Sequence, residues 1–148
     1  MSFTGGCRCG ACRYALDFAV LPASYACHCL DCQTMTGSAF SLHAVVPVSR
    51  FGIEGALEGW SRMNGEGTRT THHVCAECKT RIHSTNEGRP GLAILRTGTL
   101  DDSKDVVPVV HMWTKSRQAW VGLSMDAEVY EEAIPADRLK EVFSLNLT

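Results

Sequence analysis

The sequence predicts a mostly β fold of small sheets with a short C-terminal helical segment, and two observations support this prediction. Short runs rich in apolar and β-branched residues recur along the chain. Gly, Pro, Asn and Asp separate them at intervals typical of a small all-β sandwich or barrel. Near the end, Leu139, Val142 and Phe143 follow a helical spacing within residues 135–146. The expected strands are residues 12–18, 40–48, 71–75, 80–85, 92–98 and 106–113.

The clearest strand is expected at residues 40–48, where apolar side chains recur with a two-residue period. A shorter helix is expected from Asp126 towards Pro135, so that a helical addition occupies about residues 126–148. No stretch has the composition of a linker, and 148 residues suit one domain of ordinary size. We therefore expect a single zinc-binding domain over residues 1–148.

Composition and charge argue against several classes of protein. The formal net charge is −2, and lysines and arginines are scattered singly, which argues against binding to nucleic acid. No stretch approaches the roughly 18 consecutive apolar residues of a membrane span. The first residues lack the basic and apolar regions of a secretory signal. The expected location is therefore the cytoplasm, where thiols are kept reduced.

The cysteines are clustered, and in a reducing compartment clustered cysteines favour metal ligation over disulfides. They occupy positions 7, 9, 12, 27, 29, 32, 75 and 78. Cys75 and Cys78 in "CAEC" have the spacing of a zinc knuckle, and Cys7 and Cys9 in "GCRCG" are available to complete a tetrahedral site. A closed site of four thiolates is structural, because it leaves no coordination position for chemistry.

The segment "CHCLDC" at residues 27–32 contains three further thiols, those of Cys27, Cys29 and Cys32. Cysteines two apart on an extended strand share a face, and a following turn can bring the third alongside. Three protein ligands with a fourth position open is the arrangement that zinc enzymes use. The open position suits water or the sulfur of a thiol substrate, whose deprotonated form zinc favours. We therefore expect two Zn²⁺ ions per chain.

Cys12 leaves the division of the ligands open, because "CRCGAC" repeats the C-x-C-x-x-C spacing of "CHCLDC". It either replaces a member of the four-cysteine set or serves as a fourth ligand to the three-cysteine set. A third interpretation makes it a buried small hydrophobic residue, the commonest fate of a free cysteine. Spacing alone does not decide between them, and the third interpretation is favoured here.

The histidines give weaker signals than the cysteines. His28 lies between two candidate ligands but should point to the opposite face of the extended segment, so a surface or packing role is favoured over proton transfer. His72 and His73 sit on a predicted strand, so their side chains cannot both reach one site. His111 and Trp113 share a predicted strand face, where they either line a pocket or pack.

Five segments of the chain, taken together and in order, indicate a resemblance to a known family. They read "GGCRCGACRY", "CHCLDCQTMTGSAF", "VCAECKTRI", "RTGTLDD" and "HMWTKSRQAW". Over about residues 5–120 the sequence thereby resembles the glutathione-dependent formaldehyde-activating enzyme family, which includes the centromere protein V type. The resemblance implies a zinc-bound β-tent fold of small antiparallel sheets. It also implies a structural zinc on Cys7, Cys9, Cys75 and Cys78 and a catalytic-type zinc on Cys27, Cys29 and Cys32.

The resemblance further implies a carbon–sulfur lyase that runs in the direction of synthesis. A glutathione-like thiol near the zinc of "CHCLDC" would attack a small aldehyde such as formaldehyde, giving S-hydroxymethylglutathione or a similar adduct. Two alternatives remain open: a binding module with two structural zinc ions, as the centromere protein V relatives suggest, and a thiol redox protein. One departure concerns Lys79, which stands where the family usually has glycine. Lys79 must bear left-handed strain there, or the turn must differ.

Overall fold

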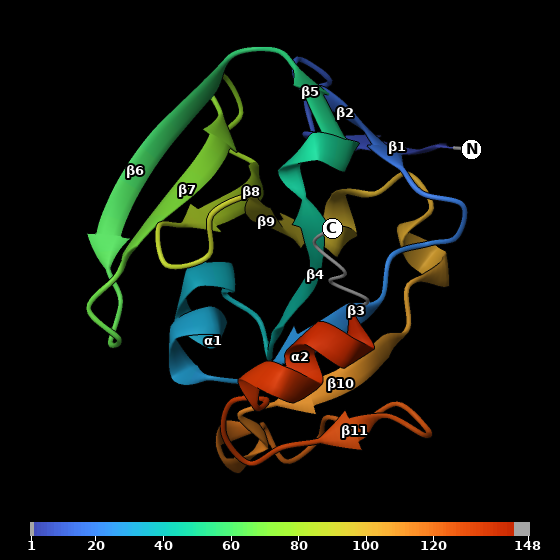
Figure 1. Cartoon of the computed structure of the whole chain (residues 1–148), viewed down its shortest axis with the longest axis vertical. Coiled ribbons are helices and arrows are strands. Elements are labelled where there is room, and N and C mark those ends of the chain that lie inside the picture. The colour runs from blue at the N-terminus through green and yellow to red at the C-terminus, as the bar shows by residue number, and fades with distance from the viewer. Residues whose placement is uncertain (1, 144–148) are drawn as a thin grey trace. The chain divides into compact units, whose positions relative to one another are not determined.

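The computed structural model describes residues 2–143, and Figure 1 shows the order of their strands and helices. The chain forms two compact units, each made from two stretches of sequence. The first unit comprises the residues up to Pro22 together with Val45–Asp105, and the second comprises Ala23–Ala44 and the residues from Val106 onwards. The single domain expected from the sequence stays a prediction.

The first unit consists of antiparallel strands. β1 (Ser2–Gly6), β2 (Arg13–Asp17) and β5 (Phe51–Glu54) form a three-stranded sheet in the order β1-β2-β5. β6 (Leu57–Met63), β7 (Arg69–Cys75), β8 (Arg81–Asn86) and β9 (Leu92–Arg96) lie side by side in that order, and each neighbouring pair is antiparallel. The core of this unit includes fully buried Leu16, Ile82 and Leu95. In β2 the expected alternation is clear, because Tyr14 and Leu16 are buried between exposed neighbours.

The second unit is built around β3 (Ser24–Cys27). The first residues of β4 (Ser41–Pro47) lie antiparallel to β3, whereas β10 (Pro108–Met112) lies parallel to it and also to β11 (Glu128–Val129). Parallel pairing therefore occurs in addition to the antiparallel pairing that was expected. All four residues of β3 are buried, as befits a strand with neighbours on both sides. Helices α1 (Leu30–Thr36) and α2 (Ala136–Val142) complete the unit, and the rings of Phe143 and Tyr25 meet edge to face.

The predicted mostly β fold with a short C-terminal helix is confirmed, and each predicted strand overlaps an observed one. The extent of the C-terminal helix needs a correction. Residues 126–135 hold turns and β11 in place of the expected helix, because Asp126 has a left-handed backbone (φ 62°), which a helix does not tolerate. Residues 144–148 of the expected helix lie outside the described residues. No helix in the described part of the chain is long and apolar enough to cross a membrane.

Candidate metal centres

The first cysteine cluster joins two parts of the first unit that are far apart in sequence. The turn after β1 supplies Cys7 and Cys9, while the end of β7 and the turn after it supply Cys75 and Cys78. The four sulfurs lie within 4.8 Å of one another. The Sγ atoms of Cys7 and Cys9 are 3.5 Å apart, and those of Cys9 and Cys75 are 3.8 Å apart.

These distances suit a shared metal ion. Four thiolates on one tetrahedral zinc, each about 2.3 Å from the metal, lie about 3.8 Å from one another. A disulfide would hold its two sulfurs at about 2.05 Å. No disulfide links the cysteines of this chain, all of which lie in its described part. The donor set and its spacing therefore fit a closed zinc site.

Local hydrogen bonds favour the thiolate form of Cys7 and Cys78 in this cluster. The backbone N–H of Cys12 donates to Cys7 Sγ over 3.2 Å, and this bond holds the pKa of Cys7 below its ordinary value. The Thr80 hydroxyl lies 3.1 Å from Cys78 Sγ, and hydrogen bonds from Thr80 lower the pKa of Cys78 to about 5. The thiolate is the form of cysteine that binds metal, so both turns prepare the cluster for an ion.

Lys79 follows the knuckle with a left-handed backbone, at φ 63°. The turn therefore has the conformation that glycine allows most easily, and Lys79 bears the strain that the sequence comparison anticipated. Its backbone N–H donates to the Cys75 carbonyl over 3.0 Å. Its Nζ lies 2.7 Å from both the Ala76 carbonyl and the Glu58 carboxylate. These bonds hold the residue in place at the end of the metal-binding turn.

Cys12 is fully buried and stands outside both cysteine clusters. Its thiol donates to the Ala56 carbonyl over 3.3 Å, and burial raises the pKa of Cys12 to about 11. A protonated, buried thiol is a poor metal ligand. These features match the third interpretation of Cys12, a small buried residue.

The second cluster comes from a single stretch of the second unit. Cys27 ends β3, Cys29 caps the N-terminus of α1, and Cys32 lies in the first turn of that helix. Their three sulfurs lie within 4.8 Å of one another. The backbone N–H of Cys32 donates to Cys29 Sγ over 3.3 Å. The turn expected to bring Cys32 alongside is thus the start of a short helix, which the sequence did not indicate because none of its residues is buried.

The three thiols of this cluster differ in exposure and in pKa. Cys27 is buried, whereas Cys29 and Cys32 are half-buried. Hydrogen bonds from Cys27 and Cys32 lower the pKa of Cys29, and the same hydrogen-bonded contacts raise the pKa of Cys27. A thiolate therefore forms at Cys29 before it forms at Cys27. This donor set fits a metal ion with three sulfur ligands and a side that is open to solvent.

A buried pair of histidines packs behind the "CHCLDC" segment. His28 Nε2 and His111 Nδ1 share a hydrogen bond over 2.9 Å, and His111 Nε2 lies 2.8 Å from the Ser124 hydroxyl. Burial lowers the pKa of both imidazoles, that of His28 to about 4, so the pair stays neutral. His28 and His111 are both buried, as the packing interpretation expects.

Three other aromatic predictions have definite outcomes. His72 stacks on Trp60 with ring centroids 4.3 Å apart, and His73 stacks on His83 at the same distance, so the two neighbours have different surroundings as expected. Trp113 needs a correction, because it lies beyond the end of β10 with a left-handed backbone (φ 58°). It therefore does not share a strand face with His111.

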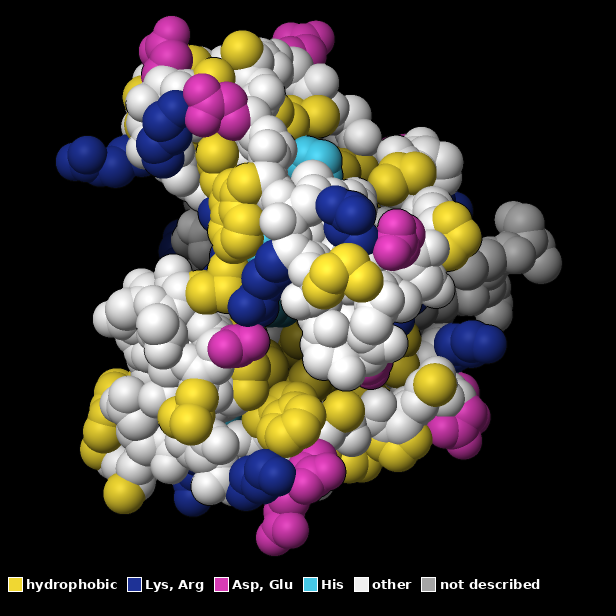
Figure 2. Space-filling view, turned by 90° about the vertical axis from the view of Figure 1, so that its left-hand side faces the viewer, with side chains coloured by type: hydrophobic (Ala, Val, Ile, Leu, Met, Phe, Trp, Pro, Cys, Tyr) yellow, Lys and Arg dark blue, Asp and Glu magenta, His cyan; other side chains and the backbone are white. Residues whose placement is uncertain are grey.

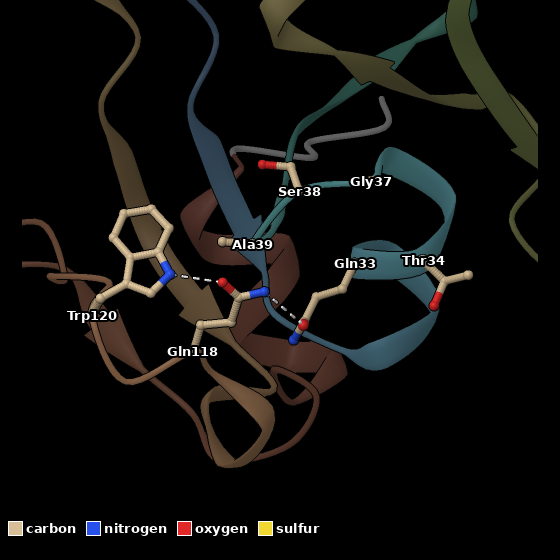
Figure 3. A pocket seen from close by; sticks show the side chains of 7 residues that line it. All are labelled: Gln33, Thr34, Gly37, Ser38, Ala39, Gln118 and Trp120. Atoms are coloured by element: carbon tan, nitrogen blue, oxygen red, sulfur yellow. Dashed lines mark hydrogen bonds between the residues drawn. The ribbon is translucent and has the colours of Figure 1, made fainter.

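A polar pocket that sequence reasoning missed lies beside α1 (Figure 3). It has a volume of about 460 Å³ and is lined by Gln33, Thr34, Gly37, Ser38, Ala39, Gln118 and Trp120. None of these lining residues is charged. Two segments far apart in sequence meet here, and although both belong to the stretches that carry the family resemblance, their spacing does not indicate that they meet. Only the fold brings them together.

Two comparisons with known proteins bear on this chain. A sequence model of a family described as "Glutathione-dependent formaldehyde-activating enzyme" matches residues 2–116. The crystal structure of a Rhodobacter sphaeroides protein resembles the chain with a TM-score of 0.52 and 20% sequence identity. That similarity covers 70% of this chain and 96% of the other chain. At this identity it supports the fold alone.

Proposed function

The chain belongs to the glutathione-dependent formaldehyde-activating enzyme family, and from that premise we propose that it is a zinc-dependent carbon–sulfur lyase. Its reaction would join a glutathione-like thiol to a small aldehyde, as in the synthesis of S-hydroxymethylglutathione, or split the adduct. The observation that carries the proposal is the second cluster, in which Cys27, Cys29 and Cys32 converge and two of the three thiols are half-exposed. Three sulfur ligands leave a tetrahedral ion one further position.

The two clusters have different roles in this proposal. Cys7, Cys9, Cys75 and Cys78 would hold a structural zinc, since four thiolates complete a tetrahedron. Cys27, Cys29 and Cys32 would hold the catalytic-type zinc. The family match spans segments of both units, so we also propose that they form one family domain over residues 1–148. A reducing compartment such as the cytoplasm suits a function that needs reduced thiols.

Zinc at the three-cysteine site would favour the thiolate form of the substrate at neutral pH. The substrate sulfur would form a bond to the aldehyde carbon, and the aldehyde oxygen would take up one proton. The protein's own contribution is to keep the ligand segment rigid. Gln33 Nε2 donates to the His28 carbonyl over 2.8 Å, and the neutral His28–His111 pair packs behind the segment. The half-exposed side of Cys29 and Cys32 leaves an approach for the thiol from solution.

The test compares wild type with Cys29→Ser, with Cys12→Ser as the matched control outside both clusters. Zinc per chain would be measured on protein purified without chelator, and adduct formation between glutathione and formaldehyde would be followed by exchange NMR. We expect about two zinc ions in wild type and in Cys12→Ser, and about one in Cys29→Ser with its circular dichroism unchanged. We also expect Cys29→Ser to lose at least a hundredfold in rate, because it lacks an ordered zinc site.

Two outcomes would contradict the proposal. One zinc ion in both wild type and Cys29→Ser would leave Cys27, Cys29 and Cys32 as thiols for redox chemistry. The other outcome is two zinc ions in wild type with no increase in the rate at which any thiol tried adds to formaldehyde. That result would favour a binding module.

A further inference from the structure

Trp120 is a large aromatic side chain that is held by hydrogen bonding while its ring stays in solvent. It is 76% exposed, so it gains little from burial. Its Nε1 donates to Gln118 Oε1 over 2.7 Å, which fixes the direction in which the indole points (Figure 3). An exposed ring with a fixed orientation at the edge of a pocket is suited to stacking against a ligand.

A series of hydrogen bonds connects Trp120 to the segment that carries the proposed zinc site. Gln33 Nε2 donates to two carbonyls, that of His28 over 2.8 Å and that of Ser116 over 2.9 Å. The Gln33 amide nitrogen has no third proton, so its Oε1 accepts from Gln118 Nε2 over 3.3 Å. The chain of donors therefore runs in one direction, from Trp120 through Gln118 and Gln33 to the carbonyl of the residue between Cys27 and Cys29.

The pocket lies next to the three-cysteine segment along the backbone. Gln33 directly follows Cys32, and its backbone N–H donates to the Cys29 carbonyl over 3.0 Å. Figure 3 shows the Gln33, Gln118 and Trp120 side chains arranged along one side of the pocket. Gln33 therefore belongs both to the lining of the pocket and to the helical turn that holds Cys29 and Cys32, and this residue links the pocket to the proposed zinc site.

The chemistry of the lining is neutral and rich in hydrogen-bonding groups. Thr34 and Ser38 offer hydroxyls, and Gln118 keeps a second N–H of its amide after donating to Gln33. The volume of about 460 Å³ is within the usual range for a small-molecule site. Glutathione has two carboxylates and one ammonium group, and no lining residue offers a charge to pair with them.

We propose that this pocket binds the part of the thiol substrate that does not carry the sulfur, and that this part is an uncharged, hydroxyl-rich ring such as a sugar. The proposal rests on the proposed function, since it places the thiol at the three-cysteine site. The C–H face of the ring packs on the Trp120 indole, while its hydroxyls bond with Gln118, Thr34 and Ser38. Glutathione is then a more weakly bound substrate of this site than a thiol that carries such a ring.

The experiment measures binding of four probes to the zinc-loaded protein by titration calorimetry. They are the cysteine amide of glucosamine, glutathione, 2-mercaptoethanol, and methyl β-glucoside, which has no thiol. Wild type is compared with Trp120→Ala and with Trp60→Ala, a matched control that removes a partly exposed tryptophan from the other unit. Gln118→Leu keeps the Trp120 indole but removes the hydrogen bond that orients it.

We expect the cysteine–glucosamine amide to bind wild type and Trp60→Ala about tenfold more tightly than either glutathione or 2-mercaptoethanol, the gain of one good aromatic contact. In Trp120→Ala this advantage should vanish while 2-mercaptoethanol binding is unchanged. Gln118→Leu should lose about threefold. Equal binding of glutathione and the sugar thiol, or an unchanged advantage in Trp120→Ala, would overturn the proposal.

The probes separate this inference from the proposed function. If no thiol binds, not even 2-mercaptoethanol, the proposed function fails. Binding of methyl β-glucoside that depends on Trp120 would still support the sugar-binding pocket in that case. If neither methyl β-glucoside nor any of the thiols binds, both the sugar-binding pocket and the proposed function are overturned.

Discussion

The two cysteine clusters use the same ligand chemistry but are assembled in different ways. Cys9 and Cys75 are separated by 66 positions along the chain, so the first cluster closes a long loop. Cys27, Cys29 and Cys32 come from six consecutive residues. An ion in the first cluster would restrict the unfolded chain as a long cross-link does, whereas an ion in the second would restrict a short segment. This difference associates the first cluster with folding and leaves the second available for chemistry.

The largest effect is expected from Cys75→Ser, because Cys75 is fully buried and belongs to the loop-closing cluster. Structural zinc contributes on the order of 10 kcal/mol to the folding of small zinc domains. We therefore expect Cys75→Ser to lower the free energy of unfolding by more than about 4 kcal/mol and to leave little folded protein at 37 °C. Cys29→Ser should lose less than about 2 kcal/mol, since its cluster closes only a short segment. Thermal unfolding followed by circular dichroism would compare them.

The control for this pair is Cys12→Ala, which also removes a buried thiol but no candidate ligand. It should cost about 1 kcal/mol from lost packing and keep both metal ions. Similar destabilisation by Cys75→Ser and Cys29→Ser would contradict the assignment of the first cluster to folding and of the second to chemistry.

Acid should also destabilise the fold through its buried histidines, and His83 of the first unit allows this effect to be measured at one residue. This imidazole is buried beside His73 and Phe51, and burial lowers its pKa from 6.5 to about 4. The neutral form stabilises the fold fully above pH 6.5, and that stability is lost as the pH falls from 6.5 towards 4. Below pH 6.5 the imidazole binds a proton in the unfolded chain but stays neutral in the folded chain until the pH approaches 4. Between pH 7 and pH 5 this single group should cost about 1 to 2 kcal/mol.

The measurement is urea unfolding of wild type and His83→Gln at both pH values. Acid also protonates metal-binding thiolates, but both proteins share that loss, so the difference between them reports on the histidine. His83→Gln should lose about 1 to 2 kcal/mol less than wild type on acidification. Parallel losses in the two proteins would show that His83 does not contribute.

The smallest effect is expected at the knuckle of the loop-closing cluster, in Lys79→Gly. Glycine removes the cost of the left-handed backbone, about 1 kcal/mol, and gives up an exposed ion pair with Glu58 that is worth less. We expect a net gain of about 0.5 kcal/mol in the free energy of unfolding. Glu58→Gln isolates the ion pair and should change stability by less than about 0.5 kcal/mol. If Lys79→Gly lowers the free energy of unfolding while Glu58→Gln leaves it unchanged, the turn is not strained.

Much of the candidate site could be predicted because its information is local. The spacing of Cys75 and Cys78 predicts a knuckle, and the contiguous "CHCLDC" segment predicts a second group of thiols. Strand β2 was recognisable as a short run with the large apolar residues Tyr14 and Leu16 two positions apart, and these two side chains are the buried ones. Helix α1 was not, since its seven residues have no buried face and so no apolar period. The helix predicted from Asp126 failed because the backbone of this segment pairs with β10 through Glu128 and Val129 instead of bonding within itself.

The sequence alone determined the β-rich class of the fold, the ligand types and the number of candidate metal clusters, because strand alternation and ligand spacing are properties of neighbouring residues. Only the tertiary structure decided that Cys7 and Cys9 meet Cys75 and Cys78, and that Cys12 turns away to the Ala56 carbonyl. The same holds for the pocket, where Gln118 bonds to Gln33 across 85 positions of the chain. Such contacts depend on how loops close and which strands pair, and these are set by the packing of the whole chain.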